Sequence, residues 1–549
     1  MSAEKRTIRI ESILGGHAPM THFAAPDQFR SSLAINPSLP ITDSRTDSFG
    51  IASSGLLRPV ASKAYTGYSG SRVNWLRGAR GTTTIFVYDN VSSAYTITPN
   101  GTAATALSDA GTLSGGEGNG LAYYDNYIYF ATATNITRYG PLDGVPGFVP
   151  SYWTGTLGKT ALTNTAYPTL RLQSGFLLKM PNHVMHRHSD GRLYIADVVD
   201  NKGTIHFIQT TKTTVEGDTD NGSTYNKVQV GYGLVPTCLE SYGSDLAIAL
   251  YERSGASSGA GHTSARDTTT RAKIAFWDTT ATNVNKITWV EFPDQIITAM
   301  KNLNGILYVF SSSIETGSGF RVSRFVGGYS FEEVYSSGVG NPPFPSGVDG
   351  TSKRLIFGSK TVIPENRGCV YSLGLENNVS SGLYNVASAT GGSSTAVIAV
   401  MLPGGEHLDA DMGFDTPIYA WDESGGTKGI DYTNNVTDYN DTVQEWWSQM
   451  YRIGQPFKIT KIRIPLAQAV AANMTVTPKI YTDEGYTVYT LTEINNTNDS
   501  GLYNIVRRSD SAGKPILGQH NFWLELRWTG SALCVVGLPI TIEYELIED

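Results

Sequence analysis

Charged residues are scarce in this 549-residue chain: they make up 16% of it, against about 25% in an average soluble protein. Lys and Arg number 41 against 49 Asp and Glu, so the net charge is −8, and no basic run occurs. A surface built to grip nucleic-acid phosphates is therefore not expected. The chain also lacks the long apolar stretch of a membrane helix, and its first residues lack the apolar region of a secretory signal. We therefore expect synthesis and folding in a cytoplasm.

Cysteine and catalytic motifs are equally sparse. The three cysteines, Cys238, Cys369 and Cys534, stand alone beside apolar segments without a CxxC pair, which predicts packing in the core. The sequence contains no GxSxG elbow, no HExxH pair, no phosphate-binding GxxxxGK[ST] loop and no GxGxxG motif after a strand. We therefore predict no catalytic residues, no cofactor site and no enzymatic activity.

What the sequence does contain is a strand pattern, which is clearest from Ile297 to Val334. A turn at Asn304-Gly305 precedes the run ILYVF, and glycines at 317 and 319 precede a second apolar segment that ends near Phe325. After Gly327-Gly328 a third segment begins. Short β-branched and aromatic runs between such turns predict a small antiparallel sheet. A sheet of this size cannot bury both faces, so it needs copies of itself as neighbours.

Degenerate copies of this unit occur along the chain, about 55 residues apart, with turns near positions 82, 126, 191, 245, 305, 354 and 416. No helix-period segment of useful length interrupts them. Units of four short strands at this spacing are typical of β-propeller blades, and seven turns predict about seven blades. An array of β-sandwiches could produce a similar pattern, because any all-β chain alternates turns and strands.

The units define four segments of an all-β chain. Residues 1–66 are rich in proline and lack the repeat, which predicts an extended N-terminal arm; residues 67–427 carry the β-propeller, and residues 428–442 form a polar linker. Residues 443–549 alternate apolar and polar positions in five short segments, which predicts an antiparallel β-sandwich or jelly roll. The arm's apolar residues need cover, and we expect a neighbouring subunit to supply it. They are Ile8, Ile10, Ile13, Leu14, Phe23, Phe29, Leu33, Leu56 and Leu57.

One cluster has metal-ligand residue types. His183, His186 and His188 occur in PNHVMHRHSDG, with Asp190 and Asp197 nearby, and a strand would place His186 and His188 on the same face. Histidines on the loop and edge of one blade explain the pattern equally well, so we predict no metal there and little loss of stability when all three become alanine. The segment SDGRLYIADVVDNKG resembles repeats of calcium-binding propeller lactonases, but no equivalent carboxylate recurs in the other repeats.

Aromatic residues in turns and between units are the remaining candidates for ligand contact or for packing between domains. Trp446 and Trp447 stand where they can pack the propeller against the C-terminal domain. The full set is Tyr65, Tyr68, Tyr152, Trp153, Trp446, Trp447 and Tyr451.

The whole arrangement resembles a virion structural protein of tailed bacteriophages, with propeller-bearing tail nozzle and tail-tip proteins as the nearest comparison. The likeness lies in an arm with GGHAPMTHF and SSGLLRPVAS, divergent blades such as AMKNLNGILYVFSSS, and the alternating C-terminal domain. It implies a homo-oligomeric ring or spike in the virion tail, contacts with other tail proteins, and a role in host attachment or genome delivery. The alternative is a glycan-binding or glycan-cleaving propeller at a phage or cell surface.

Overall fold

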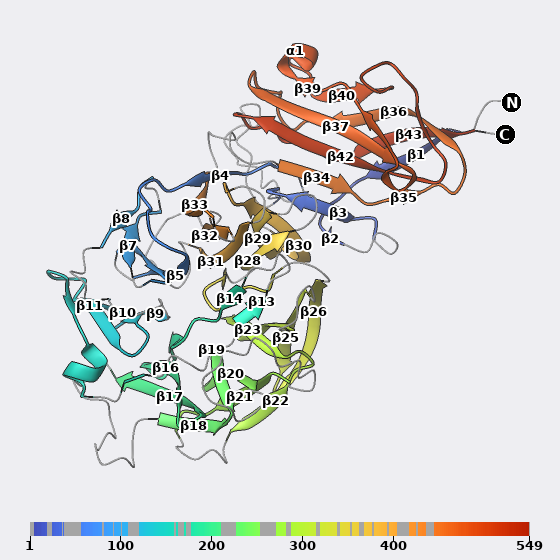
Figure 1. The fold of residues 1–549 in the computed structure, drawn as a ribbon. Coiled ribbons are helices and arrows are strands. Elements are labelled where there is room, and N and C mark those ends of the chain that lie inside the picture. The colour runs from blue at the N-terminus through green and yellow to red at the C-terminus, as the bar shows by residue number, and fades with distance from the viewer. Residues whose placement is uncertain are drawn as a thin grey trace.

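Seven four-stranded antiparallel sheets dominate the computed structural model (Figure 1). The model describes residues 5–18, 25–35, 37, 56–79, 82–91, 93–99, 102–107, 113, 120–158, 161–162, 169–171, 177–209, 227–252, 271–280, 287–313, 319–337, 341–351, 354–361, 367–375, 378–391, 395–402, 417–423, 426–434 and 444–547. Each sheet is one blade, and its strands follow one another outward from the first. Blades 1 to 4 are β5 (Val73–Gly78), β6 (Ile85–Asp89), β7 (Ala94–Ile97) and β8 (Thr105–Ala106); β9 (Gly120–Tyr124), β10 (Tyr127–Ala131), β11 (Ile136–Gly140) and β12 (Gly147–Val149); β15 (Met185–Arg187), β16 (Arg192–Val199), β17 (Lys202–Gln209) and β18 (Lys227–Tyr232); and β19 (Leu234–Tyr242), β20 (Asp245–Glu252), β21 (Lys273–Trp277) and β22 (Thr288–Glu291). Blades 5 to 7 are β23 (Ile296–Leu303), β24 (Ile306–Ser312), β25 (Phe320–Gly327) and β26 (Ser330–Ser337); β27 (Val348–Gly350), β28 (Leu355–Thr361), β29 (Arg367–Leu375) and β30 (Asn378–Ser388); and β31 (Thr395–Met401), β32 (Ile418–Glu423), β33 (Lys428–Asn434) and β4 (Ala61–Ala64).

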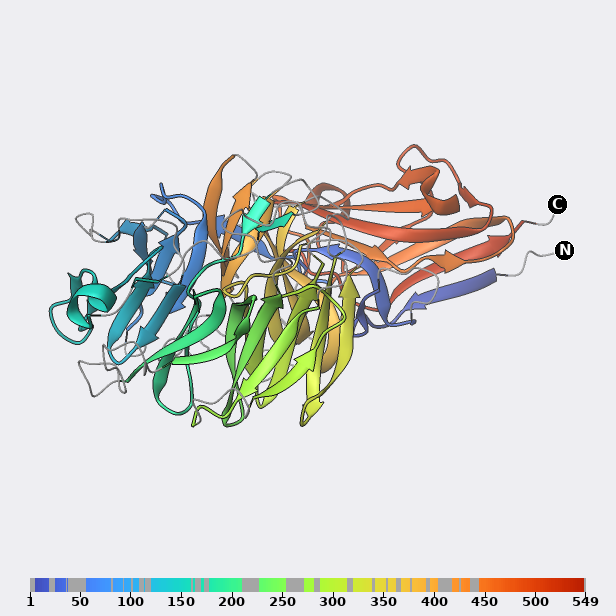
Figure 2. The same cartoon turned by 60° about the horizontal axis from the view of Figure 1, so that its bottom comes forward.

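The sheets close into a β-propeller. The first strand of each blade contacts the first strand of the next, from β5 through β9, β15, β19, β23, β27 and β31, and β31 contacts β5 again. Figures 1 and 2 show the blades following one another around this ring of first strands. The predicted propeller of about seven blades is therefore confirmed. Six of the seven predicted turns, near positions 82, 126, 191, 245, 305 and 354, lie at the hairpin between the first and second strands of a blade, and the seventh, near 416, lies outside the described residues.

Local turn chemistry explains why those positions were visible in the sequence. In blade 5, Asn304 and Gly305 have φ angles of 52° and 81°, and in blade 2 Asp125 and Asn126 have φ angles of 46° and 65°. Two successive left-handed residues form the tight hairpin turn that matches strand twist, and Asn, Asp and Gly tolerate that conformation best.

A β-sandwich lies beside the propeller and contains the alternating C-terminal strands (Figure 2). Along β37, buried and partly exposed residues alternate at every position. Its five-stranded sheet consists of β1 (Lys5–Ile10), β43 (Ile540–Leu546), β36 (Phe457–Pro465), β40 (Asn504–Arg507) and β41 (Ile516–Gly518). Its eight-stranded sheet consists of β2 (Gly16–His17), β3 (Gln28–Leu33), β34 (Gln444–Ser448), β35 (Tyr451–Arg452), β42 (Asn521–Gly530), β37 (Met474–Thr482), β38 (Thr487–Thr490) and β39 (Ile494–Asn495).

The N-terminal segment differs from the expected extended arm. Strand β1 pairs with β43, and β3 pairs with β34, so both belong to the sandwich. Strand β4 then pairs with β33 as the outermost strand of blade 7, which closes the propeller with an N-terminal strand. The apolar residues of this segment do need cover, but the cover comes from the same chain: Ile10, Ile13, Phe29, Leu33 and Leu57 are all buried. Phe23 lies outside the described residues.

The predicted linker also differs. Strand β33 occupies 428–434, inside the segment read as linker, and pairs with β32 on one side and β4 on the other. Its sequence KGIDYTN is polar although the strand is largely buried, since Asp431 and Thr433 are buried polar residues, so it lacks the alternation that marks a strand. The remaining linker residues, 435–442, lie outside the described residues.

Short elements complete the described part of the chain. The segment from Gly140 to Pro181 contains a π-helical turn η1 (Tyr152–Thr156) and a two-stranded sheet of β13 (Thr169–Arg171) and β14 (Leu177–Lys179). The sandwich adds a 3₁₀ turn η3 (Asp483–Gly485) and a single α-helical turn α1 (Asn496–Asp499). Among the described residues, no helix has the length and apolar character needed to cross a membrane.

The propeller and the sandwich share one apolar core. A single buried cluster includes Trp446 and Leu526 from the sandwich together with Val370, Tyr384 and Tyr419 from blades 6 and 7. Strands β2 and β3 also contact β30. Gly16, with a φ of 73°, lies so close to blade 6 that a Cβ there would be 2.5 Å from the backbone nitrogen of Leu383. The two units are thereby fixed against each other.

Candidate functional site

The three histidines do not form one cluster. His183 is fully buried, with Nδ1 3.2 Å from the carbonyl oxygen of Thr132 and Nε2 3.6 Å from Asp197 Oδ1. His206 approaches the other oxygen of the same carboxylate, with Nε2 3.3 Å from Asp197 Oδ2. Burial alone would raise the pKa of Asp197, but hydrogen bonds from His183 and His206 hold it well below its usual value. This group fixes blade 2 to blade 3.

His186 and His188 lie on the same side of their strand, as the spacing predicts. His186 Nε2 and His188 Nδ1 both lie 2.8 Å from the hydroxyl oxygen of Ser241 in blade 4. Burial holds the pKa of His186 well below its ordinary value, and Arg77, His188 and Lys301 lower it further. These contacts join the first strands of neighbouring blades.

The carboxylates near the histidines have local partners. Asp190 accepts hydrogen bonds from the backbone nitrogen of Arg192 at 3.0 Å and from the hydroxyl of Tyr194 at 2.5 Å. Within the described part of the chain, no group of three or more His, Cys, Asp and Glu side chains is placed to hold a metal ion.

The aromatic residues expected in turns and between units are mostly core residues. Tyr65, Tyr152, Trp153 and Trp446 are buried. The first three pack onto neighbouring blades, and Trp446 packs from strand β34 into the sandwich core. Tyr68, Trp447 and Tyr451 are partly buried. The packing role proposed for Trp446 agrees with its place in the shared core. Cys238, Cys369 and Cys534 are buried free thiols, as predicted.

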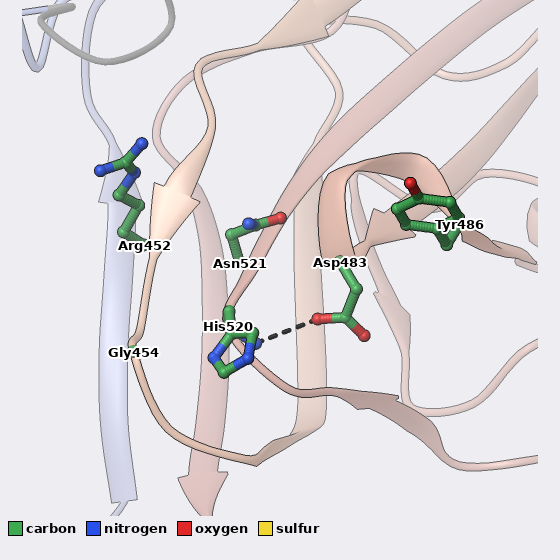
Figure 3. Close-up of a pocket in the computed structure, with 6 residues that line it drawn as sticks. All are labelled: Arg452, Gly454, Asp483, Tyr486, His520 and Asn521. Carbon is green, nitrogen blue, oxygen red and sulfur yellow. Dashed lines mark hydrogen bonds between the residues drawn. The ribbon is translucent and has the colours of Figure 1, made fainter.

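A pocket of about 510 Å³ lies on the sandwich, lined by Arg452, Gly454, Asp483, Tyr486, His520 and Asn521. Its volume lies within the range of small-molecule sites. Arg452 and Tyr486 stand on opposite sides, with Asn521, His520 and Asp483 between them (Figure 3). The Tyr486 side chain is 88% exposed, whereas Asn521 is only 6% exposed. The pocket therefore has an aromatic wall and a polar floor.

Backbone contacts hold the pocket in shape. Asp483 Oδ1 accepts hydrogen bonds from the backbone nitrogens of Gln519 at 2.7 Å and His520 at 3.0 Å. The carbonyl oxygen of His520 accepts from the backbone nitrogens of Ile453 at 2.7 Å and Gly454 at 3.0 Å. Three separate segments are thus tied together, and the polar groups they carry are positioned before any ligand arrives.

Sequence reasoning did not identify this pocket. The lining residues occupy turns and strand ends, where apolar–polar alternation gives no signal: Arg452 lies on β35, Asp483 on η3 and Asn521 at the first position of β42. The pairing of β35 with β42, with Arg452 opposite Asn521, and the hydrogen bonds of Asp483 and His520 bring the two sides together. A signal that could have drawn attention is Asp483-Glu484-Gly485-Tyr486, a turn sequence that ends on an aromatic residue between two predicted strands.

Comparison with known proteins finds structural likeness alone: no protein-family model and no curated protein matches the sequence. The Neurospora crassa Pan2 WD40 domain is 10% identical, covers 69% of this chain and 96% of its own, and has a TM-score of 0.38. The β-propeller domain of Myceliophteria thermophila Cps50 (Swd1) is 8% identical, covers 68% and 100%, and has a TM-score of 0.38. The computationally designed protein Ika8 is 11% identical, covers 67% and 98%, and has a TM-score of 0.35. At these scores, the fold assignment depends on the sheet order and the closed ring of first strands.

Proposed function

We propose that this protein is a non-enzymatic structural component of a phage virion, in the tail nozzle, the tail tip or an adjoining ring. In this role it forms a homo-oligomeric ring or spike, holds neighbouring tail proteins, and contributes to host attachment or genome delivery. The observation that carries the assembly role is an exposed apolar edge on the sandwich.

Among the described residues, thirteen large apolar side chains are exposed, and seven of them belong to the sandwich. Apart from Tyr486, which lines the pocket, five lie on or next to β38, β40 and β41, and we call this group of five the sandwich edge. Its members are Val488, Leu502, Tyr503, Val506 and Leu517.

The position of the sandwich edge favours assembly. Strands β38 and β40 are the last strands of their sheets, so each has one edge that no other described strand covers, beside the apolar side chains. The two sheets meet there, where the backbone nitrogen of Ser511 donates to the carbonyl oxygen of Thr490 at 2.8 Å. Exposed strand edges and apolar patches are places where another chain docks. Figure 1 shows β40 on the side of the sandwich away from the propeller, where a neighbour has access.

The fixed junction and the acidic charge support the same role. The shared core lets the propeller and the sandwich act as one rigid part, which a symmetric assembly requires of its subunits. A net charge of −8 would let DNA pass along a conduit without adhering to it. The glycan-binding alternative, as formulated for the propeller, has less support, because the described pocket lies on the sandwich.

The first test is location and assembly. An antibody to this chain should label the tail of the intact source particle in electron micrographs. Replacing Val506 and Leu517 with aspartate should reduce incorporation into particles at least tenfold, because charges would enter the docking surface. The matched control is Val145→Asp, at a position that is 93% exposed on the propeller. Equal incorporation of both variants, or unlabelled tails, would contradict the proposal.

A further inference from the structure

We infer that the pocket between Arg452 and Tyr486 binds an acidic saccharide, meaning a sugar unit that carries a carboxylate. This inference names a ligand class for the host-attachment part of the proposed function. It depends on that proposed function only for the biological source of the sugar. The inference comes from three features of the pocket: its exposed aromatic wall, its hydroxyl-binding floor and its basic side.

The aromatic wall is Tyr486. Its side chain is 88% exposed, although most tyrosines of the described chain are buried or half-buried. It follows η3, where Gly485 has a φ of 92° and the backbone nitrogen of Tyr486 donates to the carbonyl oxygen of Asp483 at 3.3 Å. The turn therefore fixes the backbone position from which the ring projects. An exposed ring with one apolar face and a polar tip suits the C–H face of a sugar, because it offers contact area with little loss of side-chain freedom.

The floor supplies groups that bind hydroxyls. Asn521 presents an amide, which both donates and accepts hydrogen bonds, and it is held on β42 opposite Arg452. Asp483 uses Oδ1 for the two backbone nitrogens, and Oδ2 is the oxygen that would accept a ligand hydroxyl. A site that pairs one aromatic face with amide and carboxylate groups recognises a polyol ring better than a flat apolar ligand.

The basic side selects the charge of the ligand. Arg452 lies across the pocket from the Tyr486 ring, and His520 lies between them (Figure 3). Asp483 is the single carboxylate among the lining residues, and it already accepts hydrogen bonds from two backbone N–H groups. A guanidinium presents a planar fork that matches a carboxylate in two parallel hydrogen bonds. A uronic or sialic acid unit offers both the ring for Tyr486 and the carboxylate for Arg452.

The experiment uses the full-length protein on a glycan array that carries sialic-acid-terminated and uronic-acid-terminated oligosaccharides beside neutral counterparts. Calorimetric titration with the best acidic oligosaccharide follows. We expect the protein to retain acidic glycans, Tyr486→Ala to weaken binding at least tenfold, and Arg452→Gln to remove the preference for the acidic over the neutral sugar. The matched control is Tyr232→Ala, which changes a tyrosine that is 64% exposed on blade 3 and should leave binding unchanged.

Three results would overturn the inference: no acidic glycan is retained, neutral counterparts bind equally well, or Tyr486→Ala binds like Tyr232→Ala. Melting curves of the variants separate lost binding from lost folding, and the exposure of both tyrosines makes unfolding unexpected. If no acidic glycan binds on the array, the sugar inference fails, and the antibody labelling still decides the tail location. If the tails are unlabelled, the tail location fails, and the sugar affinity measured on the isolated chain still stands.

Discussion

The side chain of His183 lies between blades 2 and 3, where it contacts Thr132 and shares the Asp197 carboxylate with His206. Asp197 is 1% exposed, so its carboxylate depends on these imidazoles for the interactions that water would otherwise supply. Removing one partner of a buried charged group leaves that group with an uncompensated desolvation cost.

This contact changes the expectation for the histidines. We predict that His183→Ala lowers the free energy of unfolding by about 3 kcal/mol, because Asp197 then keeps a single imidazole partner. His520→Ala, at an exposed position, should change it by less than about 0.5 kcal/mol. Chemical denaturation of both variants measures the difference. A loss under about 1 kcal/mol for His183→Ala would show that the residue behaves as an ordinary surface histidine.

At the scale of elements, strands β1 and β3 complete the sandwich. Strand β1 covers the edge of β43 along six paired residues, and β3 pairs with β34. Ile10, Phe29 and Leu33 are all buried in the positions these strands provide. Without them, residues 440–549 would expose two strand edges and part of the shared core.

We therefore predict that a fragment of residues 440–549 does not unfold cooperatively, although its sequence pattern alone predicts an independent domain. Adding residues 1–35 ahead of the fragment through a flexible linker should restore a cooperative transition, because the two missing edges are then paired. Thermal unfolding followed by circular dichroism distinguishes the two fragments. A cooperative transition in the fragment alone would show that β1 and β3 add little to the core.

These elements also show what the sequence could and could not reveal. The hairpin turns of the blades depend on local residues such as Asn304 and Gly305, so their positions were predictable. The partners of β1, β3 and β4 depend on tertiary pairing with strands hundreds of residues away, and a polar strand such as β33 carries no periodic signal. The pocket could not be predicted for the same reason: Arg452 and Asn521 meet through strand pairing.

For the whole molecule, buried carboxyl groups link stability to pH. Burial raises the pKa of Asp431 to about 7, against hydrogen bonds from Thr390 and the charge of Arg367, which lower it. Burial raises the pKa of Asp422 to about 6, with Arg72 and Lys428 opposing. In the sandwich, burial and the neighbouring Glu525 raise the pKa of Glu445 to about 7. Unfolded carboxyls titrate near about 4, so the folded state binds more protons between pH 4 and 7.

The sign of the effect follows from that difference. The stability that these carboxyls contribute is fully present below about pH 4, and it is lost as the pH rises through their folded pKa values of about 6 to 7. His17, which is partly buried, acts in the other direction. Burial lowers its pKa to about 4, so it destabilises the fold as the pH falls below its ordinary value of 6.5. The low pKa of His186 adds to this loss.

We predict that the melting temperature rises between pH 8 and about pH 6, because the carboxyls take up protons there. It should fall again below about pH 5, where the histidines His17 and His186 must also take up protons. Scanning calorimetry at constant ionic strength measures the profile. The control variant Asp431→Asn keeps an acceptor for the backbone nitrogen of Thr390, which donates to Asp431 Oδ2 at 2.7 Å, but it removes the titrating proton. Its profile should be flatter than that of the unaltered protein between pH 6 and 8. If the melting temperature of the unaltered protein instead rises steadily up to pH 8, ionisation of these carboxyls does not destabilise the fold. The stability of blade 7 is then not linked to proton binding.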